Sequence, residues 1–433
     1  MEHAQEFFVR DVALAAKDAS RVVALASEDT RNAALCAMAC NLRAHADEIV
    51  EANAVDMSMA YSNNMSQGLI DRLMLNRDRV YAMADALKDL AALPDPLGRV
   101  LQQRTLDGGM NLKRVSVPLG VVAMVYEARP NVTADAAGIC IKTGNACVLR
   151  GGSSALHSNM ALVRVLREAL VSGGLPESTI ELIATTDRGA TDELMSLHGI
   201  IDVLIPRGGA GLIRHCVEHS RVPVIETGTG NCHTYVHETA DIDMAQAIIM
   251  NAKTQRVGVC NACESVLIDA SIVDKAVPSI VDALCAAGVV IHADDTVRTA
   301  LEKAGINYPD QVLEATQEDW GREYLSLELS MKTVSGFTEA IEHINTYGTG
   351  HSECIVADAT SADGAYAIES FYAGVDASAV YANASTRFTD GGCFGLGAEI
   401  GISTQKLHAR GPFALEALTS YKYLIAGTGQ VRG

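Results

Sequence analysis

The first part of the chain carries apolar residues at helical spacing. Between residues 31 and 38, Ala, Leu and Met recur three and four positions apart, and Thr30 stands where a helix N-cap would be expected. Pro94 and Pro96 follow this region, and proline lacks the N–H group that a helix interior requires. The pattern predicts mainly helical structure from residue 1 to about residue 93.

A polar, strand-like passage lies between this block and Gly120. Residues 105–115 contain Gly108-Gly109, a pair that suits the turn of a β-hairpin. Because a hairpin with so little apolar surface is not stable alone, we expect it to pair with another element or another subunit. Residues 420–426 form one further strand pattern whose partner is not visible nearby.

From residue 115 to 227 the pattern changes to short apolar runs that alternate with amphipathic ones. The predicted strands are 121–126, 146–150, 180–184, 201–205 and 222–225, and the predicted helices are about 154–173, 190–197 and 210–218. Strands and helices in this alternation are typical of a parallel, doubly wound sheet. Such a sheet binds ligands beyond the carboxyl ends of its strands.

A second alternating region extends from about residue 231 to residue 385. It begins with a predicted helix at 241–254. The further strands are expected at 265–268, 289–292, 325–334, 353–357 and 379–381, and the further helices near 272–286, 337–346 and 361–373. The pattern therefore predicts two α/β domains.

Composition and charge narrow the classes of partner. Of the 433 residues, 48% are hydrophobic and 20% charged, and 34 basic against 53 acidic residues leave a formal charge of −19. This balance disfavours nucleic acid or an anionic membrane as the main partner, so an anionic substrate would need a local positive site. No apolar segment of spanning length and no signal peptide at the start are expected. Eleven scattered cysteines favour reduced thiols and a cytoplasmic location.

Two strand-to-helix junctions could hold phosphate groups. At 206–210, Gly208 and Gly209 would let backbone N–H groups approach an anion at a helix N-terminus. The alternative is an ordinary turn, and the segment is not a G-x-G-x-x-G fingerprint. At 150–154, Arg150 adds a cation and Ser153 and Ser154 add hydroxyls, which suits a phosphate on a nucleotide ribose.

Candidate polar groups also follow two of the predicted strands. Glu226, just after residues 222–225, could act as a base in a cleft, although a solvated or helix-capping glutamate explains the position equally well. After 121–126, Asn131 could donate to a developing oxyanion, and Arg129 could bind a carboxylate or phosphate. Asn131 could equally be a turn residue beside Pro130.

A possible nucleophile lies in residues 255–264, between a predicted helix and a predicted strand. Cys260 occupies this loop, but a single cysteine is weak support because free cysteine is commonly a small buried apolar residue. Cys260 and Cys263 form a C-x-x-C pair. A structural zinc site would need a second pair, and none occurs at suitable spacing. We therefore expect no metal site.

Several longer motifs resemble one known family in its own order along the chain. They are Val-Pro-Leu-Gly-Val-Val at 117–122, Tyr-Glu-Ala-Arg-Pro-Asn at 126–131, Lys-Thr-Gly-Asn at 142–145, Arg-Gly-Gly at 150–152, Ile-Pro-Arg-Gly-Gly at 205–209, Glu-Thr-Gly at 226–228, Val-Cys-Asn at 259–261, Gly-Thr-Gly-His-Ser at 348–352 and Asn-Ala-Ser-Thr-Arg-Phe at 383–388. Together they are similar to the gamma-glutamyl phosphate reductases, or glutamate-5-semialdehyde dehydrogenases, of the aldehyde dehydrogenase superfamily.

The resemblance implies an NADPH-dependent reduction of an acyl phosphate to an aldehyde in proline biosynthesis. By motif position it makes Cys260 the nucleophile. It places Glu226 at the general base and Arg150 where the superfamily usually has a lysine contacting the cofactor ribose. Glu323 resembles the carboxylate that holds the nicotinamide ribose. The remaining cofactor contacts would come from Gly151, Ser153, Gly208 and Gly209.

The resemblance leaves the oxyanion donor open. An ungapped comparison puts Arg129 at the superfamily's oxyanion asparagine, whereas Asn131 fits with a two-residue shift. Arg129 and Arg387 are candidates for binding the substrate's phosphate or α-carboxylate, which would answer the need for local positive charge.

The implied fold is aldehyde dehydrogenase-like, with two doubly wound α/β domains and a small β oligomerisation element. We expect a cofactor-binding domain at 1–228, interrupted by a hairpin near 104–117, a catalytic domain at 229–403 and a C-terminal return with an oligomerisation strand at 404–433. Implied partners are further copies of the chain, as a dimer or tetramer, and transiently glutamate 5-kinase. The alternatives are a related acylating or non-phosphorylating aldehyde dehydrogenase, or an inactive nucleotide-binding protein.

Overall fold

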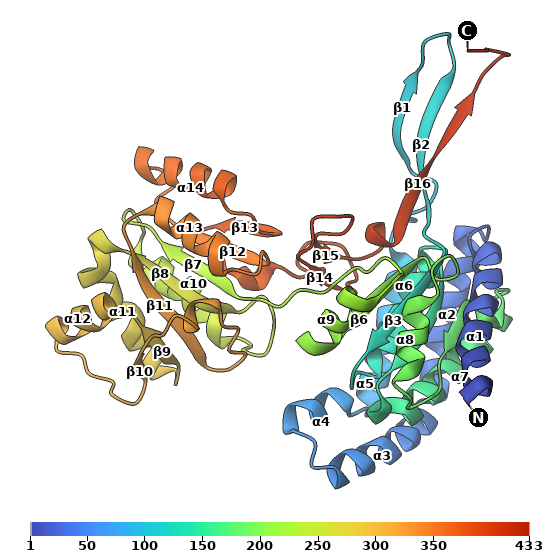
Figure 1. Ribbon diagram of the computed structural model, residues 1–433, viewed down its shortest axis with the longest axis horizontal. Helices are drawn as coiled ribbons and strands as arrows, with labels where there is room; N and C mark the ends of the chain where they lie inside the picture. Colours follow the sequence, from blue (N-terminus) through green and yellow to red (C-terminus); the bar gives the residue numbers. More distant parts are fainter. Residues whose placement is uncertain (1, 433) are drawn as a thin grey trace. The chain divides into compact units, whose positions relative to one another are not determined.

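The computed structural model describes residues 2–432 and divides into two compact units (Figure 1). Unit 1 comprises Met1–Thr227, Gly395–Gly401 and Phe413–Gly433, and unit 2 comprises Gly228–Phe394 and Ile402–Pro412. The C-terminal segment expected at 404–433 is thus shared between the two units. Each unit has its own parallel sheet.

Unit 1 begins with the helices that the apolar spacing predicted. They are α1 (Glu2–Val23), α2 (Glu28–Ala44), α3 (Ala46–Ser62), α4 (Gln67–Leu73) and α5 (Arg77–Ala92). The N-cap of α2 is Ser27, whose Oγ accepts from the Thr30 N–H at 3.1 Å. Thr30 as the cap was therefore wrong, because the helix begins three residues earlier and Thr30 supplies the donor.

A four-stranded parallel sheet forms the centre of unit 1. Its order is β5-β4-β3-β6, built from β3 (Val121–Tyr126), β4 (Ala146–Gly151), β5 (Ile180–Leu182) and β6 (Val203–Arg207). The helices between and after these strands are α6 (Asn131–Lys142), α7 (Leu156–Ser172), α8 (Gly189–Ser196) and α9 (Ala210–His219). The doubly wound prediction is confirmed, although the helix at α6 was missed.

The strand predicted at 222–225 is wrong. Only an isolated bridge joins Leu204 to Val224. Pro223, which precedes Val224, has no N–H group and cannot donate to a ladder, so pairing stops after one bridge.

The polar hairpin pairs with the late strand, which confirms that neither stands alone. β1 (Val100–Thr105), β2 (Asn111–Pro118) and β16 (Thr419–Ala426) form an antiparallel sheet in the order β1-β2-β16. The register extends from Thr419 opposite Pro118 to Ala426 opposite Asn111. Gly108 and Gly109 have φ values of 86° and 84°, the left-handed region that the hairpin turn requires. Figure 1 shows this narrow sheet extending away from the helices of unit 1.

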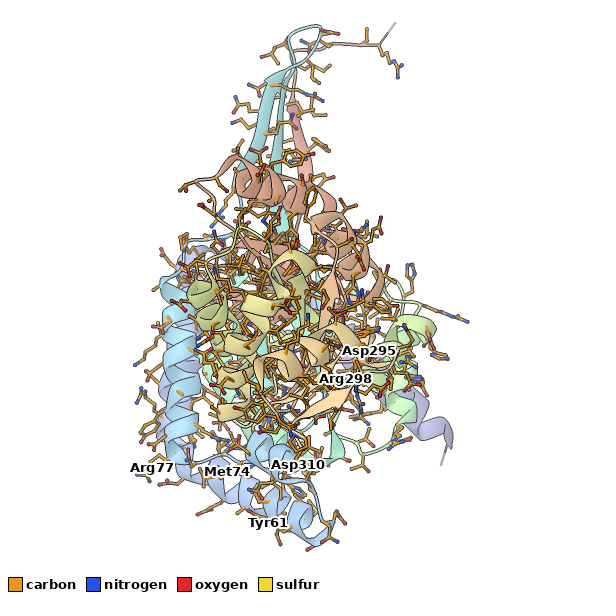
Figure 2. The ribbon with its side chains drawn as sticks, turned by 90° about the vertical axis from the view of Figure 1, so that its left-hand side faces the viewer. Tyr61, Met74, Arg77, Asp295, Arg298 and Asp310 are labelled. Carbon is orange, nitrogen blue, oxygen red and sulfur yellow. The ribbon has the colours of Figure 1, made fainter. Side chains whose placement is uncertain are left out.

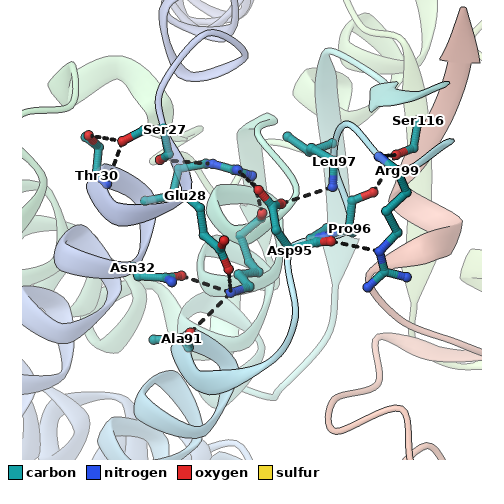
Figure 3. A network of polar contacts seen from close by, with 12 residues as sticks. Ser27, Glu28, Thr30, Asn32, Ala91, Asp95, Pro96, Leu97, Arg99 and Ser116 are labelled. Atoms are coloured by element: carbon teal, nitrogen blue, oxygen red, sulfur yellow. Dashed lines mark hydrogen bonds and ion pairs between the residues drawn. The ribbon is translucent and has the colours of Figure 1, made fainter.

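A buried polar network in unit 1 ties α2 to the start of the hairpin (Figure 3). Arg31 donates to the Asp95 carboxylate at 2.6 Å and to the Lys142 carbonyl at 2.7 Å. Lys142, itself buried, donates to Asn32 Oδ1 at 2.9 Å and to the Ala91 carbonyl at 3.1 Å. The two buried cations are thereby hydrogen-bonded, as burial of charge requires.

Unit 2 contains a seven-stranded parallel sheet in the order β10-β9-β11-β8-β7-β12-β13. The strands are β7 (Cys232–Val236), β8 (Cys263–Asp269), β9 (Val290–Ala293), β10 (Val312–Glu314), β11 (Glu328–Val334), β12 (Ser352–Val356) and β13 (Ala379–Ala382). The helices are α10 (Ile242–Thr254), α11 (Val273–Ala286), α12 (Asp295–Ala304), α13 (Phe337–Tyr347) and α14 (Ala362–Gly374). Two short strands near the C-terminus are β14 (Gly401–Ser403) and β15 (Gly411–Phe413).

Sequence patterning missed β7, α12, β10 and the short strands β14 and β15. β7 contains the polar His233 and Thr234, although all five of its residues are buried. α12 has charged residues on its outer face, where Arg298 pairs with Asp295 (Figure 2). Across the described part of the chain, no helix is long and apolar enough to span a membrane.

Candidate active site

The thiol loop, residues 255–262 between α10 and β8, carries Cys260. The thiol residue is half-buried, and a hydrogen bond from the Ala262 N–H to the Val259 carbonyl closes a turn around it at 3.1 Å. The loop precedes β8, so Cys260 lies at the amino end of this strand. Parallel sheets usually bind ligands at the opposite, carboxyl edge, which is where the sequence places the two phosphate junctions of unit 1.

The Asn-Ala-Ser-Thr-Arg-Phe segment packs against the thiol loop. Asn261 Nδ2 donates to the Thr389 carbonyl at 2.9 Å, and Thr386 Oγ1 donates to the Asn261 carbonyl at 2.8 Å. Arg387 Nε donates to Gln255 Oε1 at 2.9 Å. These contacts place the guanidinium of Arg387 beside the loop that carries Cys260.

A second guanidinium, missed by the sequence reasoning, stands near Arg387. Burial lowers the pKa of Arg387, and the nearby positive charge of Arg256 lowers it further. The Cys260 thiol acts in the opposite direction on the same group, which shows that it too is close. Arg256 and Arg387 thus create a local positive site next to the thiol in a chain of strongly negative net charge.

Gly230 and Glu323 border the thiol loop on another side. The Gly230 N–H donates to Glu323 Oε1 at 2.7 Å. A Cβ atom on Gly230 would lie 1.5 Å from the Cys260 carbonyl oxygen, so the two backbones are in direct contact. Burial raises the pKa of Glu323, whereas the Gly230 N–H lowers it.

Two other thiols near Cys260, those of Cys263 and Cys232, are fully buried. Cys263 is fully buried on β8, and burial raises its pKa to about 11. Cys232, also fully buried, donates its S–H to the Cys260 carbonyl at 3.1 Å. Within residues 2–432, no group of three or more His, Cys, Asp or Glu side chains could hold a metal ion.

In unit 1, the candidate cofactor residues gather at the carboxyl edge of the sheet. Tyr126, the last residue of β3, is in register with Gly151 of β4 and Arg207 of β6. The chain order reverses between β3 and β6, and the crevice at such a switch point is where doubly wound sheets bind ligands. The predicted junctions at 150–154 and 206–210 therefore converge.

In the turn at Gly208-Gly209, a backbone N–H group donates to a carboxylate. The Gly209 N–H donates at 2.8 Å to Oε2 of Glu127, a residue that sequence reasoning had not selected. A Cβ atom on Gly208 would lie 2.6 Å from the same oxygen. The N-terminus of α9 thus holds a carboxylate of its own chain, which is the charge preference expected of a helix N-terminus.

Arg150 is buried and anchored to the backbone. Its guanidinium donates to the Gly151 and Asp187 carbonyls, both at 2.8 Å. Burial lowers its pKa, the Asp187 charge raises it and the neighbouring Arg188 lowers it. Arg188, exposed in the loop after β5, is a further cation that sequence reasoning missed.

The other residues of the second junction differ in their surroundings. A Cβ atom on Gly151 would lie 2.0 Å from Asn159 Nδ2, so the packing of α7 already requires glycine there. Ser153, by contrast, is exposed at the start of a short 3₁₀ turn.

The segment after β3 carries both oxyanion candidates. Arg129 is half-buried, and Asn131 is the exposed first residue of α6, with its Nδ2 donating to Asp135 Oδ2 at 3.0 Å. Burial raises the pKa of Asp135 to about 6, although Asn131 and Arg207 both lower it. Glu226 is half-buried near the end of the first segment of unit 1.

Comparison with known proteins identifies the family. The aldehyde dehydrogenase family model matches residues 1–302. Gamma-glutamyl phosphate reductase of Moorella thermoacetica is 52% identical over 417 residues, covering 96% of this chain and 97% of its own. The enzyme of the same name from Thermobifida fusca is 49% identical over 424 residues, covering 98% of both chains.

A solved structure agrees with these relatives. The crystal structure of gamma-glutamyl phosphate reductase from Thermotoga maritima matches with a TM-score of 0.94 at 42% identity, covering 98% of this chain and 100% of that one. The predicted aldehyde dehydrogenase-like fold is thereby confirmed. The chain belongs to the gamma-glutamyl phosphate reductases of the aldehyde dehydrogenase family.

Proposed function

We propose that the chain reduces L-glutamate 5-phosphate (gamma-glutamyl phosphate) to L-glutamate 5-semialdehyde and phosphate with NADPH, the second step of proline biosynthesis from glutamate. The observation that carries this function is the half-buried Cys260 with Arg387 and Arg256 beside it. A nucleophilic thiol next to two cations suits an acyl phosphate, whose reacting carbon carries an anionic leaving group. Relatives of matching length carry the name of this activity.

The Cys260 thiolate attacks the γ-carbonyl carbon and forms a C–S bond. The tetrahedral intermediate then breaks its C–O bond to phosphate, which departs with the electron pair beside Arg387 and Arg256. The product is a γ-glutamyl thioester on Cys260. Bound NADPH would supply the hydride that reduces the thioester carbon. The resulting tetrahedral alkoxide re-forms its C=O bond and breaks the C–S bond, which releases the aldehyde and leaves the electron pair on the Cys260 thiolate.

Backbone N–H groups of the thiol loop, with Asn131 or Arg129, are proposed to stabilise the negative oxygen of these intermediates. Arg129 is also proposed, with Arg387, to bind the substrate's phosphate or α-carboxylate. No water attacks in the reductive direction, so Glu226 has only a proton transfer to perform, as acid or base.

The donors at the carboxyl edge of unit 1 fit a nicotinamide dinucleotide. The Gly209 N–H already donates to the Glu127 carboxylate, and a pyrophosphate is proposed to replace this carboxylate at the N-terminus of α9. Arg150, Gly151 and Ser153 are proposed to border the adenosine ribose, and Glu323 to hold the nicotinamide ribose. Arg188, adjacent to Arg150, supports NADP over NAD because a 2′-phosphate adds negative charge at this position.

Replacing Arg188 with Ala is expected to lower kcat/KM for NADPH roughly tenfold and to leave the value for NADH nearly unchanged. The loss corresponds to one charge-assisted hydrogen bond to phosphate, about 1.5 kcal/mol. Steady-state kinetics with both cofactors measure it, with Arg221→Ala, another exposed arginine of unit 1, as the control. Equal losses with the two cofactors would contradict an Arg188 contact to the 2′-phosphate.

The function is tested by following NADPH oxidation at 340 nm while gamma-glutamyl phosphate is generated in place from glutamate and ATP by a kinase. In the reverse direction, glutamate semialdehyde should reduce NADP only when inorganic phosphate is present. Reduction without phosphate would indicate a non-phosphorylating aldehyde dehydrogenase. Activity with a CoA thioester and none with the acyl phosphate would indicate an acylating enzyme. Neither outcome is expected.

The β1-β2-β16 sheet is proposed to join subunits into a dimer or tetramer. Nearly all of its β1 and β16 residues are exposed, including Val100, Leu101, Leu424 and Ile425. An apolar strand left exposed at a sheet edge is a template for pairing with another chain.

The eleven free thiols fit a cytoplasmic enzyme. The short lifetime of an acyl phosphate favours transient contact with the kinase that makes it.

Replacing Leu424 and Ile425 together with Lys is expected to reduce the assembly to monomers, because two buried ammonium groups per contact would be left without partners. Size-exclusion chromatography with light scattering measures the mass. The control is Leu407→Lys, at an exposed leucine outside this sheet. An unchanged oligomer in the double variant, or a monomeric parent protein, would rule the sheet out as the subunit contact.

A further inference from the structure

A fully buried ion pair lies directly behind the thiol loop in unit 2. Lys253, in the last turn of α10, donates to Glu264, the second residue of β8, with 2.7 Å between Nζ and Oε2. Both side chains have zero exposed area. Withdrawing two charges from water is unfavourable, and an apolar pair of similar volume often serves stability equally well. Stability alone therefore does not explain why an ion pair, and not an apolar pair, occupies this buried position.

The Glu264 carboxylate also binds backbone N–H groups in the loop that precedes β11. Its Oε2 accepts from the Tyr324 N–H at 3.3 Å and its Oε1 from the Leu325 N–H at 3.4 Å. Leu325 has φ of +56°, a left-handed conformation that a branched side chain rarely adopts without outside support. Burial raises the pKa of Glu264 to about 7, and Lys253 with the two N–H groups favours the ionised form. The carboxylate thus holds an unfavourable turn in place.

That turn immediately follows Glu323. The Glu323 carboxylate in turn accepts from the Gly230 N–H at 2.7 Å, and the Gly230 backbone touches the backbone of Cys260. A closed circuit of contacts therefore leads from Cys260 through Gly230, Glu323 and the Tyr324-Leu325 turn to Glu264, which lies only four residues after Cys260 in the chain. Every member belongs to unit 2.

We propose that Glu264, held in place by Lys253, is a positioning residue that sets the Glu323 carboxylate relative to the Cys260 thiol. The proposal rests on the function given above, in which Glu323 holds the nicotinamide ribose. Its consequence is specific to one half of the reaction. Attack of Cys260 on the acyl phosphate does not involve Glu323, whereas hydride transfer depends on where Glu323 holds the ribose.

Two double variants separate positioning from stability. Lys253→Met with Glu264→Leu removes both charges and both acceptors while keeping the buried volume apolar. Lys253→Met with Glu264→Gln removes the charges but keeps one oxygen that can accept from the turn. Neither variant leaves an unpaired buried charge, so both are expected to fold, as thermal unfolding will show.

The two half-reactions are measured separately in rapid-mixing experiments. Release of one phosphate per subunit without NADPH reports attack by Cys260, and the decay of NADPH absorbance reports hydride transfer. In the Leu variant we expect the phosphate burst at the parent rate, hydride transfer slowed roughly 100-fold, and a larger isotope effect with deuterated NADPH. The Gln variant should recover most of the hydride-transfer rate.

Equal losses in both half-reactions, or parental hydride transfer in the Leu variant, would overturn the positioning role. Failure of the Gln variant to recover would also overturn it, because the acceptor oxygen would then not matter. A parent enzyme that shows neither a phosphate burst nor NADPH oxidation would instead refute the proposed function, so the two failures are distinguishable.

Discussion

Replacing Cys260 with Ala is expected to abolish reduction of gamma-glutamyl phosphate, lowering kcat by a factor on the order of 10⁵. The mechanism has no thioester without this sulfur, and the loop offers no second nucleophile because Cys263 is fully buried with its pKa raised to about 11. Binding of NADPH should survive, since its proposed phosphate contacts belong to unit 1. Stopped assays of semialdehyde and fluorescence titration of NADPH measure the two properties.

The matched control is Cys263→Ala, which changes the other cysteine of the same C-x-x-C pair. It should retain turnover and lose only stability, because Cys263 fills space on β8. Residual turnover in the Cys260→Ala variant above a hundredth of the parent rate would contradict covalent catalysis at this residue. Loss of turnover in both variants would point to a dithiol mechanism instead.

Replacing Gly230 with Ala is expected to produce the second-largest effect. The added Cβ would overlap the Cys260 carbonyl oxygen, at 1.5 Å, and would come within 2.6 Å of its Cα atom. The clash is with backbone on both sides, so the thiol loop must move. We expect a loss of about 3 kcal/mol in the free energy of unfolding from overpacking, and a fall in kcat on the order of 100-fold because the sulfur is displaced.

Chemical denaturation and NADPH oxidation measure these two losses. Gly68→Ala on α4 is the control, because its added Cβ meets nothing within 4 Å and alanine favours a helix. Gly230→Ala with parental activity would show that the thiol loop tolerates displacement, and would remove the reason for a glycine at this position.

Much of the fold follows from local sequence patterns. Val121–Tyr126 is fully buried, and its uninterrupted apolar run predicted β3 to the residue. β7 was not predicted because His233 and Thr234 are polar, although both are buried by neighbouring strands. The prediction of a strand at 222–225 was wrong for the opposite reason, because the residues are apolar but do not form a ladder. An apolar run does not show whether a neighbouring strand can pair beside Pro223.

Some residues of the candidate site were likewise predictable from the sequence, and others were not. Motifs identified Cys260, Glu323 and Arg387 because each belongs to a short, distinctive string. Glu127 lies in such a string and Arg256 lies near one, yet both were missed, as was Arg188, which belongs to no such string. What distinguishes them is a neighbour remote in sequence, such as the Gly209 N–H that donates to Glu127 across 82 positions.

The sequence by itself determined two parallel α/β sheets, the helical beginning and the hairpin, and it singled out Cys260 as the candidate nucleophile. These depend on the spacing of apolar residues, on turn chemistry and on contiguous motifs, all of which are local. Only the tertiary structure decided that β16 completes the hairpin sheet, that Cys260 lies at the amino edge of its sheet and that Lys253 and Glu264 stand behind it. Such features depend on which distant segments become neighbours, because hydrogen bonds and ion pairs form only between groups that folding has brought together.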